Sequence, residues 1–104
     1  MAISSPIGKR LRQARTRMGL SQKELGIRAG FDEFSASPRM NQYERGKHAP
    51  DFETAAKLAA VLGVPTPFFY AEDDGMAELI LRLGQLSPNH RNLLIDQSKG
   101  QLDP

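Results

Sequence analysis

The sequence contains no cysteine among its 104 residues. This absence excludes disulfides, zinc sites built on thiolates and catalysis by a thiol. No apolar run approaches the length of a membrane-spanning helix, and the N-terminus lacks the apolar stretch of a secretory signal peptide. We therefore expect a cytoplasmic protein that has no membrane partner. The length fits one domain with a modest core and an appended terminal element.

Patterns typical of enzymes and cofactor sites are also missing from the sequence. It has no glycine-rich phosphate loop and no grouping of His, Asp and Ser. The two histidines, His48 and His90, belong to no metal-binding or catalytic motif. These observations predict a protein that is not an enzyme and that binds no metal and no cofactor.

The charged residues are distributed unevenly along the chain. Residues 1–50 hold ten Lys and Arg but four Asp and Glu, whereas the remainder holds four bases and eight acids. Such an asymmetry favours a basic half that binds a polyanion, joined to a half with another role. On charge alone, a basic face that is merely solvated is an equal alternative.

Apolar residues recur at helical spacing, and no segment shows the alternation of a β-strand. Capping residues, prolines and glycines divide this pattern into helices. In chain order the expected helices run from Ser5-Pro6 to Gly19, from Ser21 (a capping box with Glu24) to Ala29-Gly30, from Ser37-Pro38 to Gly46, from Pro50-Asp51 to Gly63 and from Pro67 to about Ala71, and a helical hairpin follows, its second helix a short one beginning at Ser87-Pro88.

The pattern therefore predicts an all-α protein with two parts. Residues 1–72 would form a five-helix domain, and residues 73–104 would form the C-terminal helical hairpin. The side chains expected to face the core of the first part are Ile7, Leu11, Ala14, Met18, Phe52, Ala55, Leu58, Ala59, Leu62, Phe68 and Phe69.

The third expected helix combines two different faces. Met40 and Tyr43 lie together on a helical wheel, while Gln42 points the opposite way. A helix this short is held by packing rather than by intrinsic stability. Gln pairs well with adenine and Arg with guanine, so the outer face suits the edges of DNA bases. The pattern predicts the recognition helix of a helix-turn-helix motif, with Pro38 and Arg45 beside Gln42, Arg39 and Asn41 on the flanks, and Glu44 at the edge of the core side.

Two stretches, LSQKELGIRAG and MNQYERGKHAPDFETAAKLAAVLGV, resemble the lambda-repressor-like, Cro-type regulators, also called the xenobiotic-response-element family. That family has Ser or Thr followed by Gln at the start of its second helix, and Ala-Gly at its end. It also has an aromatic-Glu-x-Gly sequence at the end of its third helix. The resemblance covers about residues 7–70.

This resemblance implies a sequence-specific transcriptional regulator whose partner is double-stranded DNA. The expected form is a repressor that acts as a homodimer on a palindromic operator. The alternative is a protein-interaction module of the same fold, such as an antitoxin or a coactivator subunit. We expect no small-molecule effector, because no separate ligand-binding domain is evident.

The resemblance and the helical wheel together assign roles to individual residues. Arg15 and Glu44 match a family ion pair that fixes the recognition helix to the scaffold. Gln22 matches a family Gln that lies beside a DNA phosphate, although it could also be a plain solvent-exposed residue. We expect Lys9, Arg10, Arg12 and Arg17 to be solvated. The expected base contacts are Ser37, Pro38, Arg39 and Gln42, and the expected phosphate contacts are Gln22, Lys23, Asn41, Arg45 and Lys47.

One departure from the family pattern lies just before the recognition helix. The segment Phe31-Asp32-Glu33-Phe34 looks like an insertion of about four residues. It lengthens the turn, carries two acids towards the DNA side, and leaves the docking angle of the helix open. We expect one of the two phenylalanines to pack into the core.

The C-terminal part carries a strongly apolar stripe at helical spacing. This stripe exposes more apolar surface than an isolated helix leaves in water, and its half of the chain is acidic. It predicts a dimerisation surface, although the stripe could instead fold back on its own domain. The residues are Met76, Leu79, Ile80, Leu83 and Leu86.

Overall fold

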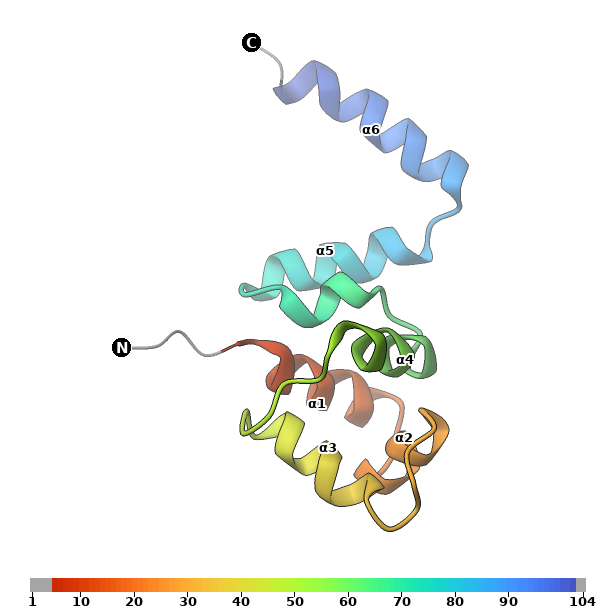
Figure 1. Ribbon diagram of the computed structural model, residues 1–104. Helices are drawn as coiled ribbons and strands as arrows, with labels where there is room; N and C mark the ends of the chain where they lie inside the picture. The colour runs from red at the N-terminus through yellow and green to blue at the C-terminus, as the bar shows by residue number, and fades with distance from the viewer. Residues whose placement is uncertain (1–4, 103–104) are drawn as a thin grey trace, which may run out of the picture.

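The computed structural model describes residues 5–102, which form six α-helices and one 3₁₀ helix. No strand occurs within this range, so the predicted all-α class is confirmed. Helices α1 to α4 and the 3₁₀ helix η1 form one body, α5 lies across it, and α6 points away (Figure 1). The elements are α1 (Ile7–Arg17), α2 (Gln22–Arg28), α3 (Ala36–Glu44), α4 (Phe52–Leu62), η1 (Thr66–Tyr70), α5 (Asp74–Gln85) and α6 (Pro88–Leu102).

The ends of the first four helices are largely those that the local sequence predicts. Ser21 and Glu24 form the expected capping box, in which each side chain accepts a hydrogen bond from the other residue's backbone. Asp51 caps α4 by accepting from the backbone N–H of Thr54 at 2.8 Å. Helix α4 ends at Gly63 in the left-handed conformation, with a φ of 68°.

One fully buried apolar side chain from each of five elements meets in the core. Because each element contributes from one stripe only, the opposite faces stay free for solvent or partners. These side chains are Leu11 of α1, Leu25 of α2, Met40 of α3, Leu58 of α4 and Phe69 of η1.

Two glycines bring the helices around α3 unusually close together. A Cβ atom on Gly8 of α1 would lie 2.5 Å from the backbone oxygen of Glu44. A Cβ on Gly26 of α2 would lie 2.7 Å from the Cβ of Ala36. Because neither position leaves space for a side chain, both ends of α3 are held directly against the backbone of a neighbouring helix.

Two residues expected in the core are exposed instead. Phe52 is 74% exposed, because it lies in the first turn of α4, outside the stripe from Ala55 to Leu62 that packs inward. Met18 is also exposed, because it follows the last residue of α1 and lies on the turn to α2.

The recognition helix starts earlier than predicted. It begins at Ala36, with Ser35 as the N-cap residue, so Ser37 lies within the first turn and is not the cap. The inserted segment causes the shift, since the carbonyl of Asp32 accepts hydrogen bonds from the backbone N–H groups of Ser35 and Ala36. Pro38 is tolerated there because the first four N–H groups of a helix have no partner within the helix.

Helix α5 packs against the body through one of its two apolar faces. Ala77 is buried, and Ile80 and Leu81 are partly buried against the core. Ile80 therefore belongs to the fold of the single chain and not to the free part of the predicted stripe. The other face carries Met76 and Leu79, which are both 50% exposed.

Arg10 anchors the start of α5 and is not the solvated residue that the sequence suggested. Its side chain is 1% exposed. Its guanidinium donates hydrogen bonds to the carbonyls of Ala71 and Glu72 at 2.9 and 3.2 Å, and to the Asp74 carboxylate at 3.0 Å. The neighbouring Lys9 adds an exposed contact to the same carboxylate, with its Nζ 3.1 Å from Asp74 Oδ1.

The C-terminal helices differ from the expected hairpin in how they are arranged. Helix α6 is long, at 15 residues, and points away from α5 (Figure 1). The bend follows from Pro88, which disfavours helical backbone at the preceding residue, and from Leu86, which is extended. Arg91 fixes it by donating to the carbonyl of Leu83 at 3.1 Å.

Candidate nucleic-acid interface

The outer face of α3 is polar and exposed, whereas its inner face is buried. Gln42 and Arg45 are exposed to solvent, and Met40 and Tyr43 on the opposite side are buried. Pro38 and Arg39 are exposed as well, and Ser37 and Asn41 are half-buried on the flank. Of the expected base-contacting residues, Pro38, Arg39 and Gln42 are therefore exposed on α3, the helix at the lower left of Figure 1, and Ser37 is half-buried.

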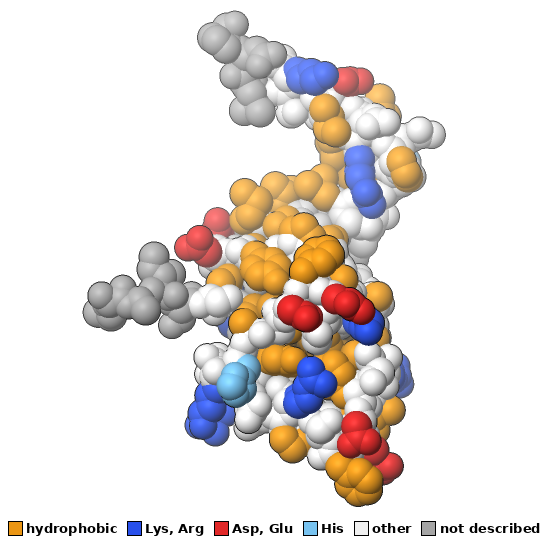
Figure 2. Space-filling model, viewed as in Figure 1, with side chains coloured by type: hydrophobic (Ala, Val, Ile, Leu, Met, Phe, Trp, Pro, Cys, Tyr) orange, Lys and Arg blue, Asp and Glu red, His pale blue; other side chains and the backbone are white. Residues whose placement is uncertain are grey.

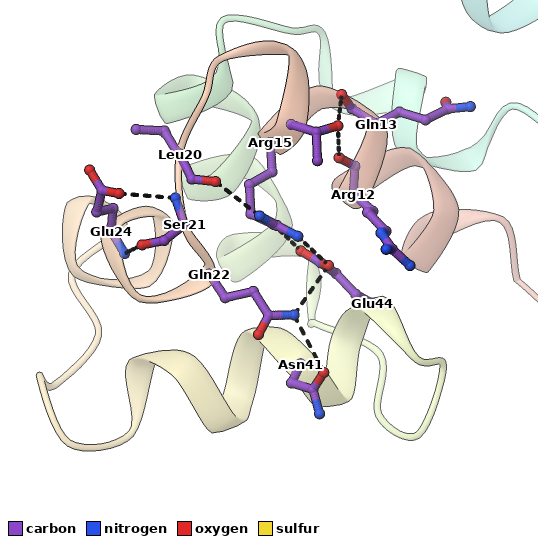
Figure 3. A network of polar contacts seen from close by, with 10 residues as sticks. Arg12, Gln13, Arg15, Leu20, Ser21, Gln22, Glu24, Asn41 and Glu44 are labelled. Carbon is purple, nitrogen blue, oxygen red and sulfur yellow. Dashed lines mark hydrogen bonds and ion pairs between the residues drawn. The ribbon is translucent and has the colours of Figure 1, made fainter.

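A bidentate ion pair fixes α3 to α1, as the sequence predicted. Arg15 Nε donates to Glu44 Oε2 at 2.6 Å and Nη2 donates to Oε1 at 3.0 Å (Figure 3). The Glu44 side chain is only 4% exposed. The hydrogen bonds to Glu44 raise the pKa of Arg15 above its ordinary value. Partial burial of Arg15 opposes this shift, and the negative charge of Glu44 adds to it. Arg15 also donates to the carbonyl of Leu20, so the turn before α2 is tied to the same group.

Gln22 connects the start of α2 to the recognition helix. Its Nε2 donates to Glu44 Oε1 at 3.2 Å and lies 3.4 Å from Asn41 Oδ1 (Figure 3). Gln22 is half-buried, so it is not the plain solvent-exposed residue of the alternative interpretation. Gln22 and Asn41, both expected at phosphates, thus lie together on the flank of α3 that faces α2.

The basic residues expected at phosphates lie at both ends of this surface. Arg45 and Lys47 are exposed at and after the end of α3. Lys23 is exposed on α2, where its Nζ lies 3.6 Å from the carboxylate of Glu33 in the inserted segment. Because exposed ion pairs are weak, this contact leaves Lys23 available to a phosphate.

The inserted segment places one phenylalanine against α3 and the other in solvent. Phe31 is partly buried, and its ring meets the Tyr43 ring edge to face, with centroids 6.3 Å apart. Phe34 is 88% exposed. The expectation that one of them packs into the core is therefore confirmed, and the residue is Phe31.

Arg39 lies between these aromatic rings and the start of α4. Its Cζ is 4.0 Å from the centre of the Phe31 ring, and its Nη2 donates to Tyr43 Oη at 3.0 Å. The pKa of Asp51 at the start of α4 is lowered, mainly by hydrogen bonds from Thr54, and Arg39 contributes a smaller attraction.

Within residues 5–102, no group of three His, Asp or Glu side chains is arranged to hold a metal ion. No helix in that range has the length and hydrophobicity needed to cross a membrane. Every buried side-chain nitrogen or oxygen described has a hydrogen-bond partner.

Comparison with known proteins identifies this arrangement. A helix-turn-helix family model matches residues 11–69, which include α2, the inserted segment and α3. The chain belongs to the helix-turn-helix family. This finding confirms the predicted resemblance to lambda-repressor-like regulators.

Two relatives of this chain are named as HTH-type transcriptional regulators. The chain is 31% identical over 68 residues to the HTH-type transcriptional regulator ImmR of Bacillus subtilis (strain 168), covering 65% of this chain and 50% of ImmR. It is 38% identical over 61 residues to the SPbeta prophage-derived uncharacterized HTH-type transcriptional regulator YonR of the same organism, covering 59% of this chain and 53% of YonR. The chain thus spans about half the length of the curated relatives it matches.

The similarity to a solved structure extends further along the chain. The crystal structure of transcriptional regulator BswR is 48% identical, with a TM-score of 0.81, and the match covers 89% of this chain and 92% of that one. A match of this length reaches beyond the helix-turn-helix body into the C-terminal helices.

Two sets of contacts, one at Arg10 and one beside α3, were not foreseen from the sequence. Arg10 looks like any other residue of the basic run, and only the position of the carbonyls after η1 distinguishes it. The Phe31–Arg39 contact joins residues eight positions apart across a turn, and the only sequence signal for it was the insertion itself.

Proposed function

We propose that this chain is a sequence-specific, double-stranded DNA-binding transcriptional regulator that represses its target as a homodimer on a palindromic operator. The proposed site of action is the cytoplasm, in line with the bacterial source of the relatives ImmR and YonR. The observation that carries the proposal is the two-sided recognition helix. Its polar outer face is exposed, while its inner face is fixed by Met40, Tyr43 and the Arg15–Glu44 pair.

The outer face of α3 suits the major groove of B-DNA. A helix fits this groove, and Gln and Arg side chains form paired hydrogen bonds with adenine and guanine. In this proposal the base-reading set is Ser37, Pro38, Arg39 and Gln42. Because Ser37 and Pro38 lie in the first turn of α3, they would reach the bases nearest the helix start.

The phosphate contacts lie around this base-reading set. Arg45 and Lys47 would neutralise phosphates on one side of the groove, and Lys23 would do so on the other. Gln22 and Asn41, which are partly engaged with Glu44 and each other, would position the backbone of the DNA through their remaining amide atoms.

The homodimer would form through the apolar surface that the single chain leaves exposed. Figure 2 shows hydrophobic side chains gathered along α5 at the hollow that separates it from α6. The residues of α6 from Pro88 to Gln101 are all exposed and lie outside the core. A second copy would cover the exposed Met76 and Leu79 of α5, the half-buried Leu83 of α5 and Leu86 just after it, and the exposed Leu93, Leu94 and Ile95 of α6.

A salt titration of DNA binding tests the proposal. If each protomer neutralises about three phosphates, the logarithm of the binding constant should fall with the logarithm of salt concentration at a slope of about −5. The measurement is a mobility-shift or filter-binding titration on genomic fragments at several salt concentrations. A slope near zero, or no binding to any fragment, would favour the protein-interaction module instead.

A further inference from the structure

The segment inserted before α3 builds a small aromatic site for one arginine. Phe31 lies outside the recognition helix, yet its ring is held in place because it contacts the Tyr43 ring and is partly buried. Arg39 Cζ lies over the Phe31 ring, 4.0 Å from its centre, and is 5.9 Å from the centre of the Tyr43 ring. One hydrogen bond, from Arg39 Nη2 to Tyr43 Oη, fixes its rotation.

This arrangement leaves most of the guanidinium free to bind. Arginine has five N–H donors in one plane. Within residues 5–102 the single hydrogen-bond acceptor for Arg39 is the Tyr43 hydroxyl, so Nε and Nη1 have no partner there. An aromatic ring covers a face of the guanidinium and not its edge, so the stack leaves the donors accessible to an acceptor in the plane.

We propose that Phe31 is a positioning residue for DNA recognition, which holds the Arg39 guanidinium in the orientation that sets its base preference. This inference rests on the proposed DNA-binding function. Phe31 itself need not touch DNA; it acts through Arg39. The inserted segment is thus part of the specificity of this chain and not only a longer turn.

The physical reason is the entropy of a long side chain. A free arginine samples many rotamers and loses that freedom when it binds a base. An arginine already stacked on a fixed ring loses less, so binding is stronger and one orientation is favoured. A cation–π contact of this kind contributes enough to change affinity by about three- to tenfold.

The test compares base preferences of full-length variants by selection of bound sequences from a random duplex pool. Arg39→Ala identifies the operator position that Arg39 reads. Phe31→Leu keeps an apolar side chain but removes the ring, and we expect it to flatten the preference at that same position and to weaken operator binding about three- to tenfold. Phe31→Tyr keeps the ring and should retain the preference. The double variant Phe31→Leu/Arg39→Ala should bind no more weakly than Arg39→Ala alone, because the two residues act as one unit.

Phe34→Leu is the matched control, since it makes the same change three residues away on a ring that is exposed. It should leave the preference at the Arg39 position unchanged, and thermal unfolding of each variant checks that the fold is retained. The inference is overturned if Phe31→Leu keeps the wild-type preference, if its effect adds fully to that of Arg39→Ala, or if it weakens operator and random DNA equally. Failure of the wild-type protein to bind any DNA would instead overturn the proposed function.

Discussion

Gln42 and Lys47 are both exposed polar residues at the recognition surface, yet we expect them to contribute differently to DNA binding. Gln42 lies on α3 directly opposite the buried Met40 and Tyr43, where, in the proposed complex, its side chain would meet base edges. Lys47 follows the end of the helix, where its flexible ammonium group would meet the phosphate backbone. We therefore expect a side chain on the outer face of the helix to contact bases, and a side chain beyond the end of the helix to contact phosphates.

We predict that Gln42→Ala weakens operator binding by about 1–3 kcal/mol and relaxes the preference at one base pair. The expected loss is that of the two hydrogen bonds that the Gln42 side-chain amide would form with one adenine, because alanine can form neither. Selection of bound sequences from a random pool measures it. A preferred motif identical to that of the wild type would show that Gln42 reads no base.

Lys47→Ala is the variant to compare with Gln42→Ala. It should weaken binding to operator and random DNA alike. The slope of the logarithm of the binding constant against the logarithm of salt concentration should become shallower by about one for each phosphate contact that is lost. A change in base preference with an unaltered slope would reverse the two assigned roles.

At the scale of elements, the close contact of α1 with the end of α3 depends on Gly8. The site that a Cβ would occupy is 2.5 Å from a backbone oxygen of α3, and backbone cannot rotate aside as a side chain can. Because Glu44 at this same end of α3 also carries the ion pair to Arg15, a shift here would disturb both contacts.

We predict that Gly8→Ala lowers the free energy of unfolding by about 1–3 kcal/mol, because the two helices must separate to accommodate the methyl group. Gly100→Ala in α6 is the control, since a Cβ there meets nothing within 4 Å. The control should be neutral or stabilising by up to about 1 kcal/mol through helix propensity. Denaturant unfolding of both variants measures the difference, and equal stabilities would contradict the close contact.

The attachment of α5 to α1 depends on pH through Asp74. Hydrogen bonds from Arg10 and Lys9, followed by their charges, hold the pKa of Asp74 below its ordinary value of 3.8. A carboxylate with a lowered pKa in the folded state stabilises the fold above its ordinary pKa. This contribution is lost as the pH falls through the folded value.

We therefore predict that Asp74→Asn is less stable than the wild type at neutral pH, and that the difference shrinks as the pH falls below the ordinary pKa and disappears below the lowered folded value. Asp96→Asn, on the exposed helix α6 and far from Arg10 in the chain, should show no such convergence. Thermal unfolding measured from pH 7 down to pH 3 would reveal it. A difference between wild type and Asp74→Asn that stays constant over this range would contradict the role of Asp74.

In the whole molecule, a packed helical body is joined to a C-terminal helix that projects from it. Residues of α1 to η1 share a core, whereas α6 extends from it with its apolar side chains Leu93, Leu94 and Ile95 exposed. A helix of this length is only marginally stable alone in water, so it would gain stability from a surface that covered it. In the proposed homodimer the recognition helices would be related by a two-fold axis.

We predict that Leu79→Glu converts the dimer to a monomer, because it places a charge in the apolar surface that a second copy would cover. Gln85→Glu adds the same charge on the polar side of α5 and should leave the dimer intact. Sedimentation at tens of micromolar protein distinguishes the two. A wild-type monomer under these conditions would contradict the dimer, and a confirmed dimer predicts operator half-sites about 34–36 Å apart.

Local sequence signals are enough to predict most of the helix ends and the two-sided recognition helix. Capping residues and glycines are local signals, so they locate helix ends such as the Ser21 capping box and the stop at Gly63 without any tertiary information. The Arg15–Glu44 pair was predictable on a different ground: each residue lies at the edge of an apolar stripe, and the family resemblance implies that the two pair.

Other contacts between segments distant in sequence, or across an irregular turn, become visible only in the folded chain. Arg10 is buried because backbone carbonyls after η1, more than sixty residues later, need its donors. Phe31 stacks on Arg39 because the inserted turn folds back onto α3, which shifted the helix start to Ala36. The stripe on α5 divided because one side of that helix meets the core and the other does not, and periodicity along a chain reports that a face is apolar but not which surface covers it.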